Sequence, residues 1–276
     1  MLPTEFAAIT NGPDGDVDLV RAALAIGYIV DPNVDDEVAR STLETLADHV
    51  RVDLGDGSSP TIVAERVCAV LFEDEGFAGD ADDYYHPRNS SLAAVLERHC
   101  GMPILLSVLY IEVARRVGLD VQGVGAPGHF LVKFNDGLQD RYLDPYNGGR
   151  HVPTAELRAA LHQALAGASS ADAYLEAVTK RQILTRILAN LKSSYLRRDD
   201  PAGALRAVDY VLAMSPWVLD EVRDRGLLLA ELGRHQEALI ALRQFREHAP
   251  DEANLDAVES VIRRLEHHDG NPTAET

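Results

Sequence analysis

The sequence predicts an α+β domain, made of a helical N-terminal lobe and a small antiparallel sheet, followed by an all-α array of helices. Apolar residues recur at helical spacing over about residues 17–70 and 90–117. The period then changes to that of strands over residues 120–145. Farther on, Pro216 and Pro250 stand 34 residues apart, which is the spacing of a repeated pair of helices.

The composition indicates a globular protein in a reducing compartment. Hydrophobic residues make up 46% of the 276 residues, enough for a sizeable core. The net charge of −18 disfavours nucleic acids and anionic membranes as partners, because like charges repel. Two cysteines, Cys68 and Cys100, are too few for a disulfide framework, and no signal-peptide pattern is present. Since the longest apolar run is interrupted by Glu112, Arg115 and Arg116, we expect a cytoplasmic protein with no membrane span.

The N-terminal lobe is predicted to begin with three helices. The first follows Asp16 or Asp18, either of which would cap it. The second covers about residues 35–52, and the third covers about residues 61–73 after a loop rich in turn formers. Cys68 lies in or beside the third helix, where a small buried hydrophobic residue is the default interpretation.

Two further helices are predicted to meet at a short break. Asn89 or Ser90 would cap the first, and Gly101 would close it. The second begins at Pro103, since a residue without an N–H group suits the first turn of a helix. It ends at Gly118.

The sheet is predicted from short β-type runs and one turn. If Asp136–Gly137 is a two-residue hairpin turn, Asn135 pairs with Leu138 and His129 pairs with Asp144. Opposed side chains in such a ladder lie about 5 Å apart at Cβ. The local sequence therefore predicts an imidazole beside a carboxylate, although a slip of one residue in the register would separate them.

The C-terminal repeat resembles tetratricopeptide helical pairs over about residues 184–267. A shift of 34 residues matches Ala204 to Ala238, and Gly226 stands where a small residue is expected. The first unit departs from the pattern at Lys192. The resemblance implies either a protein-binding or dimerising surface or a structural buttress.

The order of Cys100, His129 and Asp144 is that of a thiol, an imidazole and a carboxylate. A thiol enzyme places its nucleophile at a helix N-terminus, its histidine takes the proton, and a carboxylate orients the histidine. Cys100 is instead predicted at the C-terminal end of a helix, where partial negative charge disfavours a thiolate. His129 is interpreted either as a pocket residue or as a surface residue, and Asp144 either as its partner or as a brace of the following turn.

Three stretches carry a family resemblance: "HPRNSSLAAVLERHCGMPILLSVLYIEVARRVGL", "GVGAPGHFLVKF" and "YLDPYNGGR". They resemble the transglutaminase core. The similarity is greatest to the bacterial SirB-type transglutaminase-like proteins, which join such a core to tetratricopeptide repeats. The resemblance covers about residues 19–152. It implies that His129 and Asp144 match the family's histidine and aspartate. It also places Pro103 in the slot of the nucleophilic cysteine, with Cys100 three residues earlier.

The resemblance leaves two functions open. The first is a degenerate member, or pseudoenzyme, that binds a protein or peptide partner through the cleft or the repeats. The second is an active thiol-dependent acyltransferase or peptidase, in which Cys100 attacks an amide carbonyl, His129 is the general base and Asp144 orients it. No cofactor or metal is expected, because paired ligand spacings are absent, and the sequence specifies no oligomeric state. The predicted domains are residues 1–178 for the transglutaminase-like part, 179–268 for the repeats, and 269–276 for a disordered tail.

Overall fold

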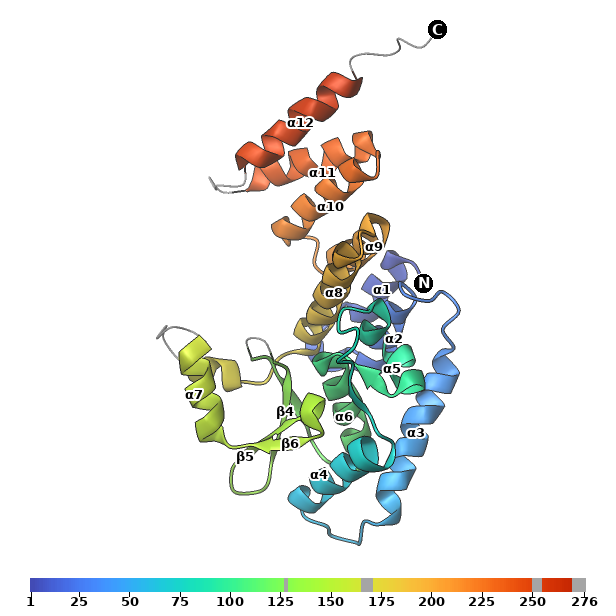
Figure 1. The fold of residues 1–276 in the computed structure, drawn as a ribbon, viewed down its shortest axis with the longest axis vertical. Helices are drawn as coiled ribbons and strands as arrows, with labels where there is room; N and C mark the ends of the chain where they lie inside the picture. Colours follow the sequence, from blue (N-terminus) through green and yellow to red (C-terminus); the bar gives the residue numbers. More distant parts are fainter. Residues whose placement is uncertain (127–128, 165–170, 250–254, 270–276) are drawn as a thin grey trace. The chain divides into compact units, whose positions relative to one another are not determined.

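The computed structural model describes residues 1–126, 129–164, 171–249 and 255–269 (Figure 1). The chain divides into two compact units, one of residues 12–187 and one formed by residues 1–11 with the chain from Leu188 onward. The division falls inside helix α8 (Lys180–Arg197), whereas the sequence predicted a boundary between residues 178 and 179.

The predicted tail lies outside the described residues except for Asp269. None of the described helices is long and apolar enough to cross a membrane.

The helical lobe of the first unit surrounds one central helix, α6 (Pro103–Arg116). Its side chains from Pro103 to Ala114 are all buried, and α6 contacts α3, α4, α5 and strand β4. Figure 1 shows α6 between the other helices of the lobe and the sheet. The remaining helices of the lobe are α2 (Leu19–Gly27), α3 (Asp36–Val52), α4 (Pro60–Cys68), which continues as a π-helix over Ala69–Asp74, and α5 (Leu92–Arg98).

The N-cap of α2 agrees with the prediction, whereas that of α5 differs from it. Asp18 caps α2, since its Oδ1 atom accepts a hydrogen bond from the Arg21 N–H group at 2.9 Å. The N-cap of α5 is Ser91, so the prediction of Asn89 or Ser90 was wrong. The Asn89 side chain instead donates to the carbonyl of Asp83 at 2.8 Å and holds the preceding loop.

The C-terminus of α5 also differs from the prediction. His99, with φ of 55°, occupies the left-handed cap position that was assigned to Gly101. Its ring stacks on Phe77 at 4.3 Å between centroids and contacts the Glu75 carbonyl through Nδ1 at 2.6 Å, which compensates for an unusual backbone angle. Gly101 instead belongs to a short strand, β2 (Cys100–Gly101), which pairs in parallel with β1 (Ala78–Gly79).

The predicted antiparallel sheet is present and contains one strand more than was predicted. Its order is β3-β4-β5-β6, and the unexpected strand β6 lies at one edge. Helix α7 (Thr154–Ala164) contributes Leu157 and Leu161 to an apolar cluster with residues of the sheet. The strands are β3 (Gln122–Val124), β4 (Leu131–Asn135), β5 (Asp140–Asp144) and β6 (Arg150–Val152).

The hairpin between β4 and β5 has a longer turn than predicted. Asn135 pairs with Asp140, so its predicted pairing with Leu138 was wrong. Asp136 holds a four-residue turn, because its Oδ1 atom accepts hydrogen bonds from the N–H groups of Leu138 and Gln139 at 2.8 and 2.9 Å. These bonds and the Arg141 guanidinium lower the pKa of Asp136 to about 2. The register therefore shifts by two residues, and a shift by two keeps each side chain on its predicted face of the sheet.

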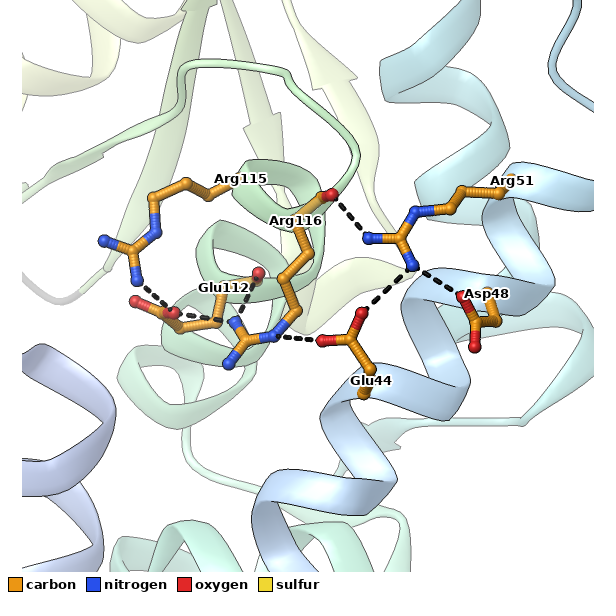
Figure 2. A network of polar contacts seen from close by, with 6 residues as sticks. All are labelled: Glu44, Asp48, Arg51, Glu112, Arg115 and Arg116. Atoms are coloured by element: carbon orange, nitrogen blue, oxygen red, sulfur yellow. Dashed lines mark hydrogen bonds and ion pairs between the residues drawn. The ribbon is translucent and has the colours of Figure 1, made fainter.

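A network of charges ties the end of α6 to α3 (Figure 2). The Glu112 side chain is only 1% exposed, and its Oε2 atom accepts hydrogen bonds from Arg115 at 2.7 Å and from Arg116 at 2.9 Å. Glu44 of α3 lies 3.5 Å from Arg116, and Arg51 of α3 donates to the Arg116 carbonyl at 2.7 Å. The charges that interrupt the apolar run of α6 are therefore paired with one another.

Helices α8, α9 (Pro201–Met214), α10 (Leu219–Glu231) and α11 (His235–His248) form two repeated helical pairs, followed by α12 (Leu255–Asp269). Gly226 confirms the expected close approach, since a Cβ atom there would lie 2.5 Å from the Leu242 side chain. Helix α1 (Pro3–Thr10), which was not predicted, packs on α9, where Phe6 contacts the ring of Tyr210 at 4.9 Å between centroids.

The departure from the repeat at Lys192 is explained by an ion-pair network. Its Nζ atom lies 2.7 and 2.8 Å from the two carboxylate oxygens of Glu221 and 3.0 Å from Asp224. The side chains of Lys192 and Glu221 are 16% and 14% exposed. Lys192 therefore links α8 to α10 by ion pairs. A small residue at this position would instead allow the two helices to pack directly against each other.

We expect Arg116→Ala to lower the free energy of unfolding by about 2 kcal/mol, because it removes both a mostly buried partner of the Glu112 carboxylate and the contact with Glu44 of α3. The matched control is Arg115→Ala, which removes a guanidinium that is 55% exposed and should cost less than about 1 kcal/mol. Urea denaturation followed by circular dichroism measures both. Equal losses in the two variants would contradict the importance of the link to α3.

Lys192→Ala should destabilise the repeat array by about 1–3 kcal/mol, since it leaves two partly buried carboxylates side by side. Hydrogen exchange of α10 amides reports this locally. Arg243→Ala is the control, because the Arg243–Glu266 pair is about half exposed and should contribute little. Unchanged exchange in Lys192→Ala would show that the network adds nothing to the packing of α8 and α10.

Candidate functional site

His129 lies in the loop between β3 and β4, and its backbone is held from two sides. Its carbonyl accepts a hydrogen bond from Arg186 Nη2 at 3.0 Å, and the same nitrogen donates to Ala126 at 3.1 Å. The next carbonyl, that of Phe130, accepts a hydrogen bond from Ser107 of α6 at 3.2 Å. The imidazole itself is 55% exposed. The loop is therefore anchored through its backbone while the His129 ring stays accessible.

Asp144 lies at the end of β5 and is buried. Its carboxylate caps the following 3-10 turn, because Oδ1 accepts from the Asn147 N–H group at 3.3 Å and Oδ2 accepts from the Asn147 side chain at 2.7 Å. The same Oδ2 atom lies 4.0 Å from His129 Nδ1. This distance exceeds a hydrogen bond, so the pair interacts through charge when the imidazole is protonated.

The structure thus brings His129 and Asp144 together, as the sequence predicted, but by another route. The two residues are not opposed in the ladder, because the register of β4 and β5 is shifted and His129 precedes β4. They line one pocket of about 280 Å³ together with residues of β4, β6 and α7. Among the described residues, neither Cys100 nor any residue of α6 lines this pocket.

Pro103 is the first residue of α6, and Met102 is the residue before the helix. Ser107 lies one turn farther on the same helix face and contacts the Phe130 carbonyl, so this face of α6 is directed at the His129 segment. Cys100 is in β2, between the end of α5 and the start of α6. No hydrogen bond joins its sulfur to His129 or Asp144 in the described part of the chain.

Cys68, the second cysteine, is half-buried against the glycine turn that follows Asp144. Its sulfur donates to the Gly149 carbonyl at 3.7 Å. Burial raises the pKa of the Cys68 thiol to about 11, so the thiol stays protonated at neutral pH. Within the described residues, no group of three or more histidine, cysteine or acidic side chains could hold a metal ion.

Sequence reasoning missed the residues that support this site. Asn147, which binds both carboxylate oxygens of Asp144, lies inside the quoted "DPYNGG" turn and could have been found from its spacing. Arg186 had no local signal, because it contacts His129 across 57 positions of the chain. Its guanidinium also lies over the Phe130 ring, 5.5 Å from the centroid.

We expect Arg186→Ala to raise the amide hydrogen exchange of Phe130 and Leu131 by about tenfold or more, because two carbonyl contacts of the loop are lost. Arg186→Lys should restore part of the protection, since an ammonium can reach one carbonyl but lacks the planar fork. The matched control is Arg181→Ala on the same helix, whose guanidinium contacts Gly12 instead. Loss of protection in the control alone would contradict the anchoring role of Arg186.

Comparison with known proteins identifies both parts of the chain. Residues 37–189 match the transglutaminase-like superfamily, and residues 191–263 match a tetratricopeptide repeat. A UPF0162 protein of Xylella fastidiosa is 36% identical over 251 residues, which is 89% of each chain. A UPF0162 protein of Vibrio cholerae is 30% identical over 265 residues, covering 91% of this chain and 93% of the relative.

A more partial similarity extends to an animal protein. Human F-box only protein 21 is 30% identical over 165 residues, which is 56% of this chain and 26% of that protein. The two family matches and the long bacterial alignments confirm the resemblance drawn from the sequence motifs. The chain belongs to the transglutaminase-like superfamily, among the UPF0162 proteins, and carries a C-terminal tetratricopeptide repeat region.

Proposed function

We propose that this chain is a degenerate transglutaminase-like protein that binds a protein or peptide partner and performs no thiol chemistry. The observation that carries the proposal is Pro103 at the first position of α6. Proline has neither a nucleophilic atom nor a backbone N–H group. If the nucleophile slot of the family lies at this helix start, the position that would activate a thiol holds a side chain that only starts a helix.

The position of Cys100 supports the same proposal. It follows the left-handed cap of α5 and precedes α6, so it is not within the first turn of a helix. It also does not line the pocket that His129 and Asp144 share. The described residues at the start of α6 do not line that pocket either, so what disfavours Cys100 is its place outside the N-terminus of a helix.

An active thiol enzyme is the second candidate, and the 4.0 Å approach of His129 and Asp144 favours it. In that function Cys100 would attack an amide carbonyl, and His129 would accept the thiol proton and pass it to the leaving amine. Asp144 would orient the imidazole. The firm cap that Asp144 forms with Asn147 supplies a structural reason for the same aspartate, so its presence does not require catalysis.

The repeat region is the second element of the proposed binding function. Repeats of this family generally present surfaces to other proteins. Trp217, the single tryptophan of the chain, is 74% exposed between α9 and α10. An exposed tryptophan is the side-chain type most enriched at binding hot spots, which supports a protein partner for this region.

The two free cysteines support a cytoplasmic location for the protein.

Site-resolved alkylation with iodoacetamide between pH 6 and 10 tests the proposal. We expect the pH profile of Cys100 labelling to be the same in the wild type and in His129→Ala. Cys68 should remain unlabelled at pH 8, since a pKa of about 11 leaves roughly one thiolate in a thousand. Labelling of Cys100 well below the free-thiol pKa of about 8.5, lost in His129→Ala, would establish the active enzyme instead.

Pro103→Cys provides the positive control for the position of the slot. Because Pro103 is buried, the ionisation of the new thiol is followed by its thiolate ultraviolet absorbance; it should ionise at lower pH than Cys100, and His129→Ala should remove this difference. Pro103→Ala shows whether the helix tolerates the loss of proline. A new thiol that ionises at no lower pH than Cys100, in a folded protein, would contradict the assignment of Pro103 to the nucleophile slot.

A further inference from the structure

We propose that the pocket beside His129 and Asp144 receives an uncharged aliphatic side chain of a peptide, of the size of leucine or valine. This inference rests on the binding function proposed for the same site and names its ligand class. Its basis is the distribution of apolar and charged groups around the pocket.

The larger part of the pocket wall is apolar. Helix α7 contributes a stripe of four residues at helical spacing, and the sheet and the loop before His129 contribute the rest. Among the residues that the structure describes, no aromatic one lies in the wall. The apolar wall consists of Ala126, Leu131, Val152, Leu157, Ala160, Leu161 and Ala164. Such a surface stabilises an aliphatic group by about 25 cal/mol for each Å² that it removes from water.

The charged groups of the wall are already paired with one another. Arg150 Nη2 lies 3.0 Å from Glu156 Oε1, and Arg150 Nη1 lies 3.4 Å from Glu156 Oε2. The Asp144 carboxylate is bound by Asn147 and approached by His129. A ligand ammonium or carboxylate would have to displace one of these contacts to be compensated. Charged ligands are therefore disfavoured relative to neutral ones.

A carboxamide is disfavoured for a related reason. The Asn147 side-chain N–H donates to Asp144 at 2.7 Å, so one amide of the pocket is already engaged. A glutamine side chain placed against the α7 stripe would lose its hydrogen bonds to water without regaining all of them. An aliphatic side chain carries no such penalty, and the pocket accordingly selects against the amide that transglutaminase chemistry would need.

The size of the pocket limits the ligand to about one side chain. Its volume of about 280 Å³ is at the lower limit of the roughly 300–1,000 Å³ typical of sites for drug-sized molecules. The exposed edge of the pocket is formed by His129 and by the Arg150–Glu156 pair, both about half exposed. Peptide main chain would remain at this polar edge, where its amide groups keep contact with water and with the imidazole.

The experiment is a titration of the full-length protein, labelled with ¹³C at alanine and leucine methyl groups, followed by NMR. The probes are the N-acetyl methylamides of leucine, glutamine and lysine. We expect the leucine probe to shift the methyl signals of Leu157, Leu161 and Ala160 at a concentration about tenfold lower than the glutamine or lysine probe requires. Tighter binding of the glutamine or lysine probe, or no response to leucine, would overturn the inference.

Ala160→Phe and Ala159→Phe form a matched pair of variants on α7. Both alanines are exposed, but only Ala160 lines the pocket. Ala160→Phe should weaken the leucine probe about tenfold or more by filling the pocket, and Ala159→Phe should leave it unchanged. Equal effects in a folded pair would show binding elsewhere. Preference for glutamine overturns the ligand class alone, whereas a Cys100 thiol activated by His129 overturns the proposed function, so the two failures are distinguishable.

Discussion

The burial of α6 between the helical lobe and the sheet is the constraint on which this domain depends. A helix buried on nearly every side must begin and end without unpaired polar groups. Pro103 meets this condition at the start, because it brings no N–H group to the first turn. Near the end, the buried Glu112 carboxylate is compensated by Arg115 and Arg116. Ser107, in the middle, uses its hydroxyl to fix the strand segment beside His129.

The placement of the His129 loop follows from this arrangement. Ser107 binds the Phe130 carbonyl and Arg186 binds the His129 carbonyl, so the backbone of this segment is held while no hydrogen bond to the His129 ring is found among the described residues. Asp144 is fixed independently by the turn that it caps. The two side chains therefore meet because their backbones are held, and their mutual attraction is too weak at 4.0 Å to organise the site by itself.

The parts of the fold that were predictable from sequence are those set by local patterns. The limits of α6 followed from Pro103 and Gly118, and the paired repeats followed from the 34-residue period. The hairpin register was not predictable from "NDGL" alone, because the Asp136 side chain stabilises a four-residue turn that competes with the two-residue type. The cap at His99 depends on packing against Phe77, a contact between residues 22 positions apart in the sequence.

Only the residues of the candidate site that are close in sequence were predictable, because only they are set by local patterns. His129 and Asp144 are near in sequence and flank one hairpin, whereas Arg186 comes from a helix far along the chain. This distinction bears on function. The carbonyls of His129 and Phe130 accept hydrogen bonds from the side chains of Arg186 and Ser107, and Asp144 is held by the turn that it caps. Such contacts stabilise the fold whether or not a thiol is present. The pair of His129 and Asp144 is therefore compatible with a site that binds without reacting. Under the proposed function, the proline at the start of α6 is what separates binding from thiol catalysis.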